Sequence, residues 1–241
     1  MRSLINVSAV ALLAAGVATP AIAQDEGGGM SPFSSIDAYL MHSTIDNDTS
    51  ATGIDDSEIG AGMRLRLGLG DWIFLSGGFQ SVRVNNPELQ NGNTGQGDQT
   101  RRFREQYFEG GLRYGFGERD TVTVFATVGD FRAKWSGDVV VGSASEDGSG
   151  LIYGGGVQWA VVPGFQVNAS YRRSDEFDAG DFDEITAGGA LQISNSFALV
   201  AEYRMAGFEI EDAENGGDLQ FDDIRLGMRF SFQGAQSDSF Y

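Results

Sequence analysis

Apolar and polar residues alternate with a period of two along most of the chain, and no stretch keeps the period of about 3.6 residues that marks an amphipathic helix. The clearest run is 224–232, in which every even position is large and apolar and every odd position is Arg, Gly or Ser. Runs 61–69, 165–172 and 197–205 follow the same scheme. Such alternation predicts β-strands with one face in apolar surroundings and the other in polar ones.

Ten runs of this kind can be marked, and their connections sort into two sets. The runs are 34–43, 57–69, 72–83, 104–116, 121–132, 150–161, 165–173, 184–193, 197–207 and 221–232. Tight-turn residues fill the short connections around 70–71, 117–120, 162–164 and 194–196. Longer, polar and acidic connections occupy 44–56, 84–103, 133–149, 174–183 and 208–220. Because short and long connections strictly alternate, we expect an up-and-down meander with two unlike ends.

The third run departs from strict alternation, because its apolar residues fall on both parities. The odd positions hold Ile73, Leu75 and Phe79, whereas the even positions hold Trp72, Phe74, Val82 and Val84. A β-bulge adds one residue to a strand and so shifts its parity, and glycine is common at such places. We therefore expect a bulge near Gly77 and Gly78.

The N-terminus carries the pattern of a secretory signal peptide. Met1 and Arg2 give a positive start, residues 4–18 are mostly apolar, and Ala21 and Ala23 supply small residues at a cleavage site. We expect a signal peptide over 1–23 and a flexible, acidic and glycine-rich segment over 24–33. The chain is therefore expected to be exported.

Composition excludes several classes of function. The chain of 241 residues has no Cys and one His, which excludes disulfides, thiolate metal sites, Cys nucleophiles and His clusters. A formal net charge of −18 argues against binding nucleic acid, because phosphate contacts need clustered Lys and Arg. No cofactor-binding motif is present, and we expect no cofactor and no resident metal.

Two all-β architectures can bury the alternating pattern. A soluble barrel or sandwich turns its apolar face inward, whereas a transmembrane barrel turns it toward lipid around a polar interior. The signal peptide and the aromatic residues beside the short turns favour the second: Tyr114, Phe116, Trp159, Phe165, Phe197, Phe230 and Phe232. Lipid cannot satisfy an open sheet edge. We predict a closed antiparallel up-and-down transmembrane β-barrel over 34–232, with about ten strands, eight or twelve remaining open.

With its signal peptide, alternating strands and aromatic ending at 224–232, the chain resembles a Gram-negative outer-membrane β-barrel protein of the small porin-like or OmpA/OmpX-like group. The resemblance implies an outer-membrane location, short turns and both termini in the periplasm, and long loops outside the cell. It also implies that Phe230 and Phe232 form the signal read by the barrel-insertion machinery. A tail, 233–241, follows, so either Phe232 or Tyr241 could end that signal.

Charged residues on the polar face of the strands would point into the lumen. The candidates are Glu58, Arg64, Arg66, Glu105, Glu109, Arg113, Arg172, Glu202, Arg204, Asp223, Arg225 and Arg229. They could order water and select ions in a narrow channel, or they could pair into a plug that leaves no path. Barrels of about ten strands are close to the eight-stranded type with a filled interior, which favours the plug.

The long connections hold most of the acidic residues, which could bind divalent cations or simply keep the loops solvated. The segment 46–57 resembles a calcium loop poorly, since Ala51 and Ser57 stand where Gly and Glu are needed. Arg101, Arg102 and Arg104 form a basic cluster near the outer rim. They could contact lipopolysaccharide phosphates or be an ordinary positive loop flank.

The only imidazole, His42, shares parity with Ile36, Ala38 and Leu40 and so should face lipid or the rim. Outer-membrane proteases and lipid hydrolases of barrel type need a positioned His, so this orientation argues against an enzyme. We expect a structural or surface-interaction protein with acidic loops and a charge-filled narrow lumen, in contact with lipid and lipopolysaccharide. The alternative is a narrow passive channel for small solutes, and an outer-membrane hydrolase is a distant third.

Overall fold

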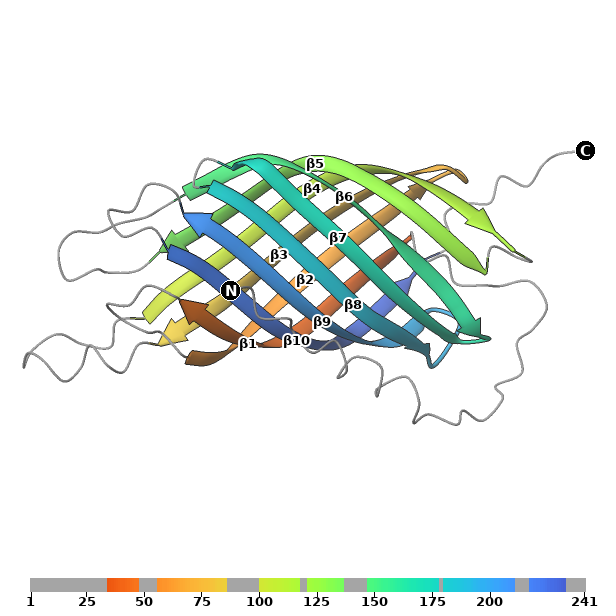
Figure 1. Cartoon of the computed structure of the whole chain (residues 1–241). Coiled ribbons are helices and arrows are strands. Elements are labelled where there is room, and N and C mark those ends of the chain that lie inside the picture. Colours follow the sequence, from red (N-terminus) through yellow and green to blue (C-terminus); the bar gives the residue numbers. More distant parts are fainter. Residues whose placement is uncertain are drawn as a thin grey trace, which may run out of the picture.

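Ten antiparallel strands form a closed barrel in the computed structural model of the chain (Figure 1). The structure describes residues 34–47, 56–85, 100–117, 121–136, 147–177, 180–210 and 217–232. The strands are β1 (Ser35–Asn47), β2 (Asp56–Leu69), β3 (Ile73–Asn85), β4 (Thr100–Phe116), β5 (Val122–Ser136), β6 (Asp147–Val162), β7 (Phe165–Phe177), β8 (Gly180–Gln192), β9 (Phe197–Ile210) and β10 (Gly217–Ser231). No helix among these residues is long and apolar enough to cross a membrane.

Each strand pairs with its neighbours in the sequence, and β1 pairs with β10 to close the sheet. The closing register runs from Ser35 opposite Ser231 to Asn47 opposite Leu219. No strand is therefore left with an open edge, which lipid could not satisfy. The predicted up-and-down topology is confirmed, and the number of strands is ten.

The outward face of the barrel is apolar and the inward face is polar. Leu40 and Ile59 are 66% and 72% exposed, whereas Asp37 and Arg204 are each 1% exposed. A water-soluble barrel has the opposite arrangement, because the hydrophobic effect drives apolar side chains inside. Figure 1 shows that the strands run obliquely around the barrel. The predicted transmembrane architecture follows from this inversion.

Glycines allow the tight turns at one end of the barrel. Gly70, Gly117 and Gly164 adopt φ of 77°, 89° and 80°, a region that side chains with a Cβ rarely enter. These turns lie in the connections that follow β2, β4 and β6. We call this end of the barrel the short-turn end, and the opposite end the long-loop end.

Aromatic side chains gather on the outer face of the short-turn end. The rings of Trp72 and Tyr114 lie 5.5 Å apart, and those of Phe197 and Phe230 lie 5.2 Å apart. All four residues are exposed on the barrel surface. Aromatic rings favour the interface between lipid and water, so they mark one boundary of the apolar belt.

The strands run further at the long-loop end than the sequence predicted. β5 ends at Ser136 rather than 132, β9 ends at Ile210 rather than 207, and β10 begins at Gly217 rather than 221. The connection predicted as long over 174–183 is short, because only residues 178–179 separate β7 from β8. The strand boundaries predicted at this end were therefore wrong by up to four residues.

The boundary errors arise because apolar and polar residues exchange positions in the alternation near the long-loop end. In β10, Ile224 faces outward and Asp223 inward, whereas one step further Phe221 is buried inside and Asp222 lies outside. In β8, Ile185 is outward and Phe182 is fully buried inside. Above the reversal, polar residues face outward and apolar residues face the lumen. The reversal marks the second boundary of the apolar belt, since beyond it the outer face meets water.

The same reversal explains part of the mixed parity of the third run, at Val82; Phe74 is a separate apolar residue on the lumen side near the short turns. Pairing of β3 with β2 and β4 is continuous across Gly77 and Gly78, so the predicted bulge is wrong. Val82 points into the lumen at the long-loop end, and Phe74 points into it near the short turns, each with 2% exposure. Register shifts occur instead between Ala160 and Val162 and between Ser174 and Phe177.

Candidate functional site

The centre of the lumen is a guanidinium surrounded by three carboxylates. Arg204 of β9 donates to Glu105 of β4 at 2.7 and 2.8 Å, to Asp223 of β10 at 2.9 Å, and to Glu184 of β8. Arg204 is 1% exposed, and its three partners are equally inaccessible. The alternation of strands places all four side chains on the inward face, where no apolar partner could satisfy them.

A second cluster joins the two ends of the chain. Asp37 of β1 accepts hydrogen bonds from both arms of Arg229 of β10, at 2.7 and 2.9 Å, and from Arg64 of β2 at 3.2 Å. Arg64 also donates to Glu202 of β9 at 2.7 Å. These pairs cross the β1–β10 closure and therefore stabilise the seam of the barrel.

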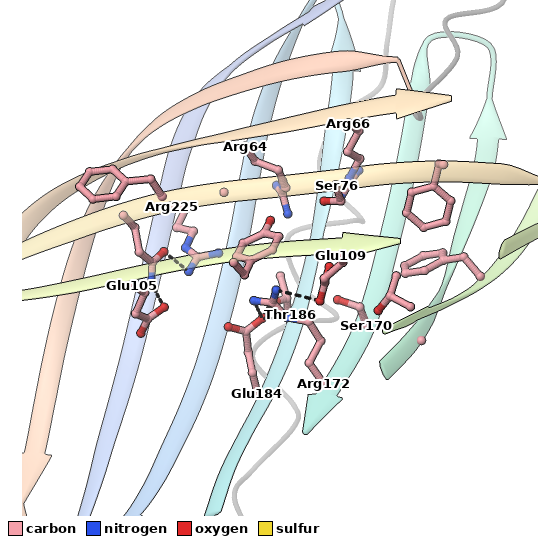
Figure 2. A pocket seen from close by; sticks show the side chains of 18 of the residues that line it. Arg64, Arg66, Ser76, Glu105, Glu109, Ser170, Arg172, Glu184, Thr186 and Arg225 are labelled. Atoms are coloured by element: carbon pink, nitrogen blue, oxygen red, sulfur yellow. Dashed lines mark hydrogen bonds and ion pairs between the residues drawn. The ribbon is translucent and has the colours of Figure 1, made fainter. Parts of the chain in front are cut away.

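The remaining charged residues connect these clusters across the lumen. Arg172 of β7 donates to Glu184 at 2.6 Å and lies 3.4 Å from Glu109 of β4. Gln80 of β3 accepts from Arg225 of β10 at 2.6 Å and donates to Glu105. Figure 2 shows these side chains converging from opposite walls of the barrel. The lumen is thus filled by one continuous polar network.

Two tyrosines fill space above glycines of neighbouring strands. Tyr39 lies against Gly62, and Tyr107 lies against Gly78, where an added Cβ would meet each ring at 2.6 and 2.4 Å. The Tyr39 ring stacks beneath Arg225 and the Tyr107 ring beneath Arg172, at 5.1 and 4.4 Å from the guanidinium carbons. Glycine on the inward face therefore makes room for cation–π contacts within the network.

An apolar layer, which we call the aromatic cap, closes the lumen at the long-loop end. Phe208 of β9 contacts Phe182 of β8 and Phe103 of β4, with ring centroids 4.8 and 5.6 Å apart. Phe131 stacks on Phe182 at 4.4 Å, and Phe221 stacks on Phe103 at 4.6 Å. Smaller apolar side chains complete the layer: Met41, Ile45, Val82, Ala133, Ile152 and Ala206.

The lumen is more open toward the short turns. A cavity of about 50 Å³ lies beside the charged network (Figure 2). Its lining includes members of the network, such as Glu105, Glu184 and Arg225, together with Arg66, Ser76, Thr127 and Ser170. A volume of this size holds a few water molecules, since each needs about 10–15 Å³. The cavity is too small to form a wide aqueous channel.

Outside the barrel, the long-loop end carries segregated charge. We name as the basic rim the outward-facing cations of β3, β4 and β5 above the apolar belt: Arg83, Arg102, Arg104, Arg132 and Lys134. On the strands further round the barrel the outward residues are mainly acidic: Asp175, Asp181, Asp183 and Asp222. There the Tyr153 hydroxyl and the Arg173 guanidinium donate to Asp175 and hold the pKa of that carboxyl below its usual range.

Like charges lie directly opposite one another in the basic rim. Arg83 of β3 is the register partner of Arg102 of β4, and Arg104 of β4 is the register partner of Lys134 of β5. Directly opposed like charges on one face destabilise a sheet. Arg132 of the rim also forms an ion pair with Asp130 at 3.0 Å, and both of these side chains are exposed.

Most candidate lumen residues come together inside the barrel. Those within the polar network or its cavity are Arg64, Arg66, Glu105, Glu109, Arg172, Glu202, Arg204, Asp223, Arg225 and Arg229. Arg113 lies at the short-turn end and donates to the backbone carbonyls of Asp71 and Gly70 at 3.0 and 2.7 Å. Glu58 is half-buried near the long-loop end of β2.

Sequence reasoning missed Asp37, Glu184 and Gln80, which hold the network together. Parity could have found them, since each stands beside an outward apolar residue in a predicted strand. The aromatic cap was also missed, because its phenylalanines fall where the alternation reverses. His42 faces outward, with Ile59 and Ile224 as its cross-strand neighbours.

Other predictions lie wholly or partly outside the described residues. These are the signal peptide 1–23, the segment 24–33, the tail 233–241 with Tyr241, residues 48–55 of the calcium-like segment, and the side chain of Arg101. Phe230 is exposed on the outer face, and the backbone N–H of Phe232 donates to Ser34 at 2.9 Å, closing the sheet. No cluster of three or more potential metal ligands occurs among the described residues.

The model of the outer membrane protein beta-barrel domain matches residues 9–232. No curated protein sequence matches the chain. Similar solved structures include Ail, the attachment invasion locus protein of Yersinia pestis, with 17% identity over 81% of this chain and 97% of that chain and a TM-score of 0.42. Neisserial surface protein A shares 10% identity over 82% and 96%, with a TM-score of 0.43. The outer membrane protease OmpT from Escherichia coli shares 7% identity over 86% and 99%, with a TM-score of 0.47.

Proposed function

The chain belongs to the outer-membrane β-barrel family, and we propose that it is a closed barrel that acts through its outer surface by binding the phosphates of lipopolysaccharide. The observation that carries this proposal is the basic rim. Five cations on three adjacent strands stand just above the apolar belt of a chain with a net charge of −18. Surface charge this uneven indicates a partner of opposite sign.

The height of the basic rim matches the position of lipid headgroups. The outward apolar residues of β9 run from Phe197 to Met205, about nine residues. At about 3.3 Å per residue and a tilt of about 40°, they span roughly 20–25 Å, close to the apolar band of an outer-membrane barrel. Arg83, Arg102 and Arg104 lie directly beyond this band. Phosphate groups of a lipid in the adjoining leaflet would meet them there.

The register of the rim brings its cations together in pairs. Arg83 is opposite Arg102, and Arg104 is opposite Lys134. Guanidinium groups bind phosphate oxygens with two parallel hydrogen bonds. The two side chains of each pair can therefore bind the same phosphate.

The proposal requires that the long-loop end face the outside of the cell, where lipopolysaccharide lies, and that both termini lie in the periplasm. The short turns at the opposite end, beside the exposed aromatic residues, support this orientation. The filled lumen supports a surface role over the alternative of a passive channel, because the aromatic cap and the polar network leave no open path. We assign no catalytic role to His42, whose outward neighbours are apolar.

Binding of lipid A by the refolded protein tests this function. The triple variant Arg83→Gln/Arg102→Gln/Arg104→Gln should bind lipid A about tenfold or more weakly, since each lost phosphate contact removes about 0.5–1 kcal/mol at a solvated surface. Binding of the wild type should weaken as salt rises, because salt screens exposed charges. Affinity can be measured with lipid A diluted into neutral phospholipid vesicles.

Arg173→Gln is the matched control, since Arg173 also faces outward at the long-loop end but lies among aspartates on β7. This variant should bind lipid A as the wild type does. Lipid A stripped of its phosphates should bind weakly to both. Equal affinity of the triple variant and the wild type, or equal affinity for the dephosphorylated lipid, would overturn the proposal.

A further inference from the structure

The cavity beside the charged network contains a cation that forms no ion pair with the described residues. Four arginines line this cavity (Figure 2), and three of them have a carboxylate within 4.0 Å: Arg64, Arg172 and Arg225. The fourth, Arg66 of β2, has none among the described residues.

The charges nearest to Arg66 make this position unfavourable for a lone cation. Its strongest electrostatic neighbours are Arg64 and Arg229, which repel it. Asp37 also lies nearby, but it already accepts hydrogen bonds from both of those arginines. Arg66 is partly buried, and no carboxylate among the described residues forms an ion pair with it. Its guanidinium N–H donors are therefore available to a small anion that enters the cavity.

Hydroxyl groups around the cavity complete a set of donors. Ser76 of β3 is the register partner of Arg66, and Thr127 of β5 and Ser170 of β7 line the same space. A guanidinium offers five N–H donors and each hydroxyl offers one. Three carboxylates, those of Glu105, Glu109 and Glu184, also line the cavity. Each lies within 3.4 Å of Arg172 or Arg204, which offset their charge. We propose that the cavity binds a small inorganic anion through Arg66.

The size of the cavity and its access limit the ligand. About 50 Å³ holds a halide with a few waters, or one tetrahedral oxyanion, but not a sugar or a lipid headgroup. The aromatic cap closes the lumen at the long-loop end, where Phe131 and Ile152 are completely buried. Lumen-facing residues at the other end, Thr123 and Gln166 among them, remain half-buried. The anion therefore enters from the short-turn end, apart from the basic rim.

Unfolding in urea at constant ionic strength tests the site. The wild-type protein, refolded in detergent, is measured in sodium gluconate and then with gluconate replaced stepwise by chloride or phosphate. Gluconate, a six-carbon acid, is too large for the cavity. A ligand that binds only the folded state raises its stability with ligand concentration. We expect the urea midpoint of the wild type to rise and saturate with the small anion.

Arg66→Gln should lose this dependence and should be at least as stable as the wild type in gluconate, because it removes a repelled cation. Arg113→Gln is the control, since Arg113 lies at the same end but donates to the backbone carbonyls of Gly70 and Asp71. It should keep the anion dependence. The rim arginines are unchanged in both variants, so phosphate at the basic rim cannot account for a difference between them.

Three results would overturn the proposal. They are an unchanged wild-type midpoint in every anion, an Arg66→Gln variant that keeps the dependence, and an Arg66→Gln variant much less stable than the wild type in gluconate. The last would mean that Arg66 pairs with a carboxylate of the protein, such as Glu109. If the variant does not fold, wild-type crystals soaked in bromide answer directly, since the proposal requires an anomalous peak at hydrogen-bond distance from Arg66.

Discussion

Arg204 is the residue on which the interior of the barrel most depends. Its guanidinium joins β4, β8 and β10 through Glu105, Glu184 and Asp223, and its exposure is 1%. Each carboxylate is as buried as the arginine, so none can turn to water when the pair is broken. Buried ion pairs of this kind contribute little relative to apolar packing, but the loss of one partner leaves an uncompensated charge.

Replacing Arg204 with Met should therefore destabilise the barrel by about 3–5 kcal/mol, the usual cost of breaking a buried ion pair. Glu105 would lose the arginine that pairs with it, whereas Glu184 and Asp223 would keep Arg172 and Arg225. Urea unfolding of the protein refolded in detergent measures the change.

Arg132→Met is the control for that measurement. Arg132 also lies beside a carboxylate, that of Asp130 at 3.0 Å, but both side chains are more than half exposed. Ion pairs at the surface contribute at most about 1 kcal/mol to the free energy of unfolding. If both substitutions lower the free energy of unfolding by the same amount, the network does not stabilise the fold as described.

At the scale of the strands, the reversal of the apolar phase divides each wall into two zones. Within the apolar belt the lumen-facing side chains are charged. Between the belt and the long loops they are aromatic, as Phe182, Phe208 and Phe221 show. The aromatic cap holds the strand ends together where no lipid surrounds them. It thereby extends the sheet toward the loops and closes the lumen.

Phe208→Ala should destabilise the barrel by about 3–5 kcal/mol, because Phe208 contacts four other rings and its removal leaves a cavity. Faster hydrogen exchange should be confined to the long-loop ends of β8, β9 and β10, while the belt stays protected. Phe197→Ala, on the outer face among the girdle aromatics, should not change exchange at those ends. Uniformly faster exchange in Phe208→Ala would show that the cap is not a separate layer.

The sequence predicted the strands well because lipid imposes strict alternation, as at Ile224, Leu226 and Met228. It failed where two environments meet. Val82 was taken as a sign of a bulge, and Phe182 and Phe208 were placed in connections although both lie in strands. The partners of the polar network could not be assigned from sequence, since Arg229 and Asp37 lie 192 residues apart and meet only when the barrel closes. Individual lumen charges were predictable from parity, but their pairing was not.

The whole molecule is a barrel of outer-membrane type whose interior is organised in layers. From the long loops to the short turns these layers are the aromatic cap, the polar network and a small cavity that contains Arg66. On the outside, the apolar belt is bounded by aromatic residues at one end and by a charged rim at the other. Because the interior is filled, the proposed function depends on the outer surface.

Single-channel recording of the refolded mature protein in a planar bilayer tests this account most directly. With the lumen closed by the cap and the network, the inserted protein should produce no stable conductance steps. Insertion itself is established separately by the altered gel migration of the unheated barrel. Stable steps whose size changes in Arg66→Ala or Glu109→Ala would contradict the account, because they would place both residues in an open pore.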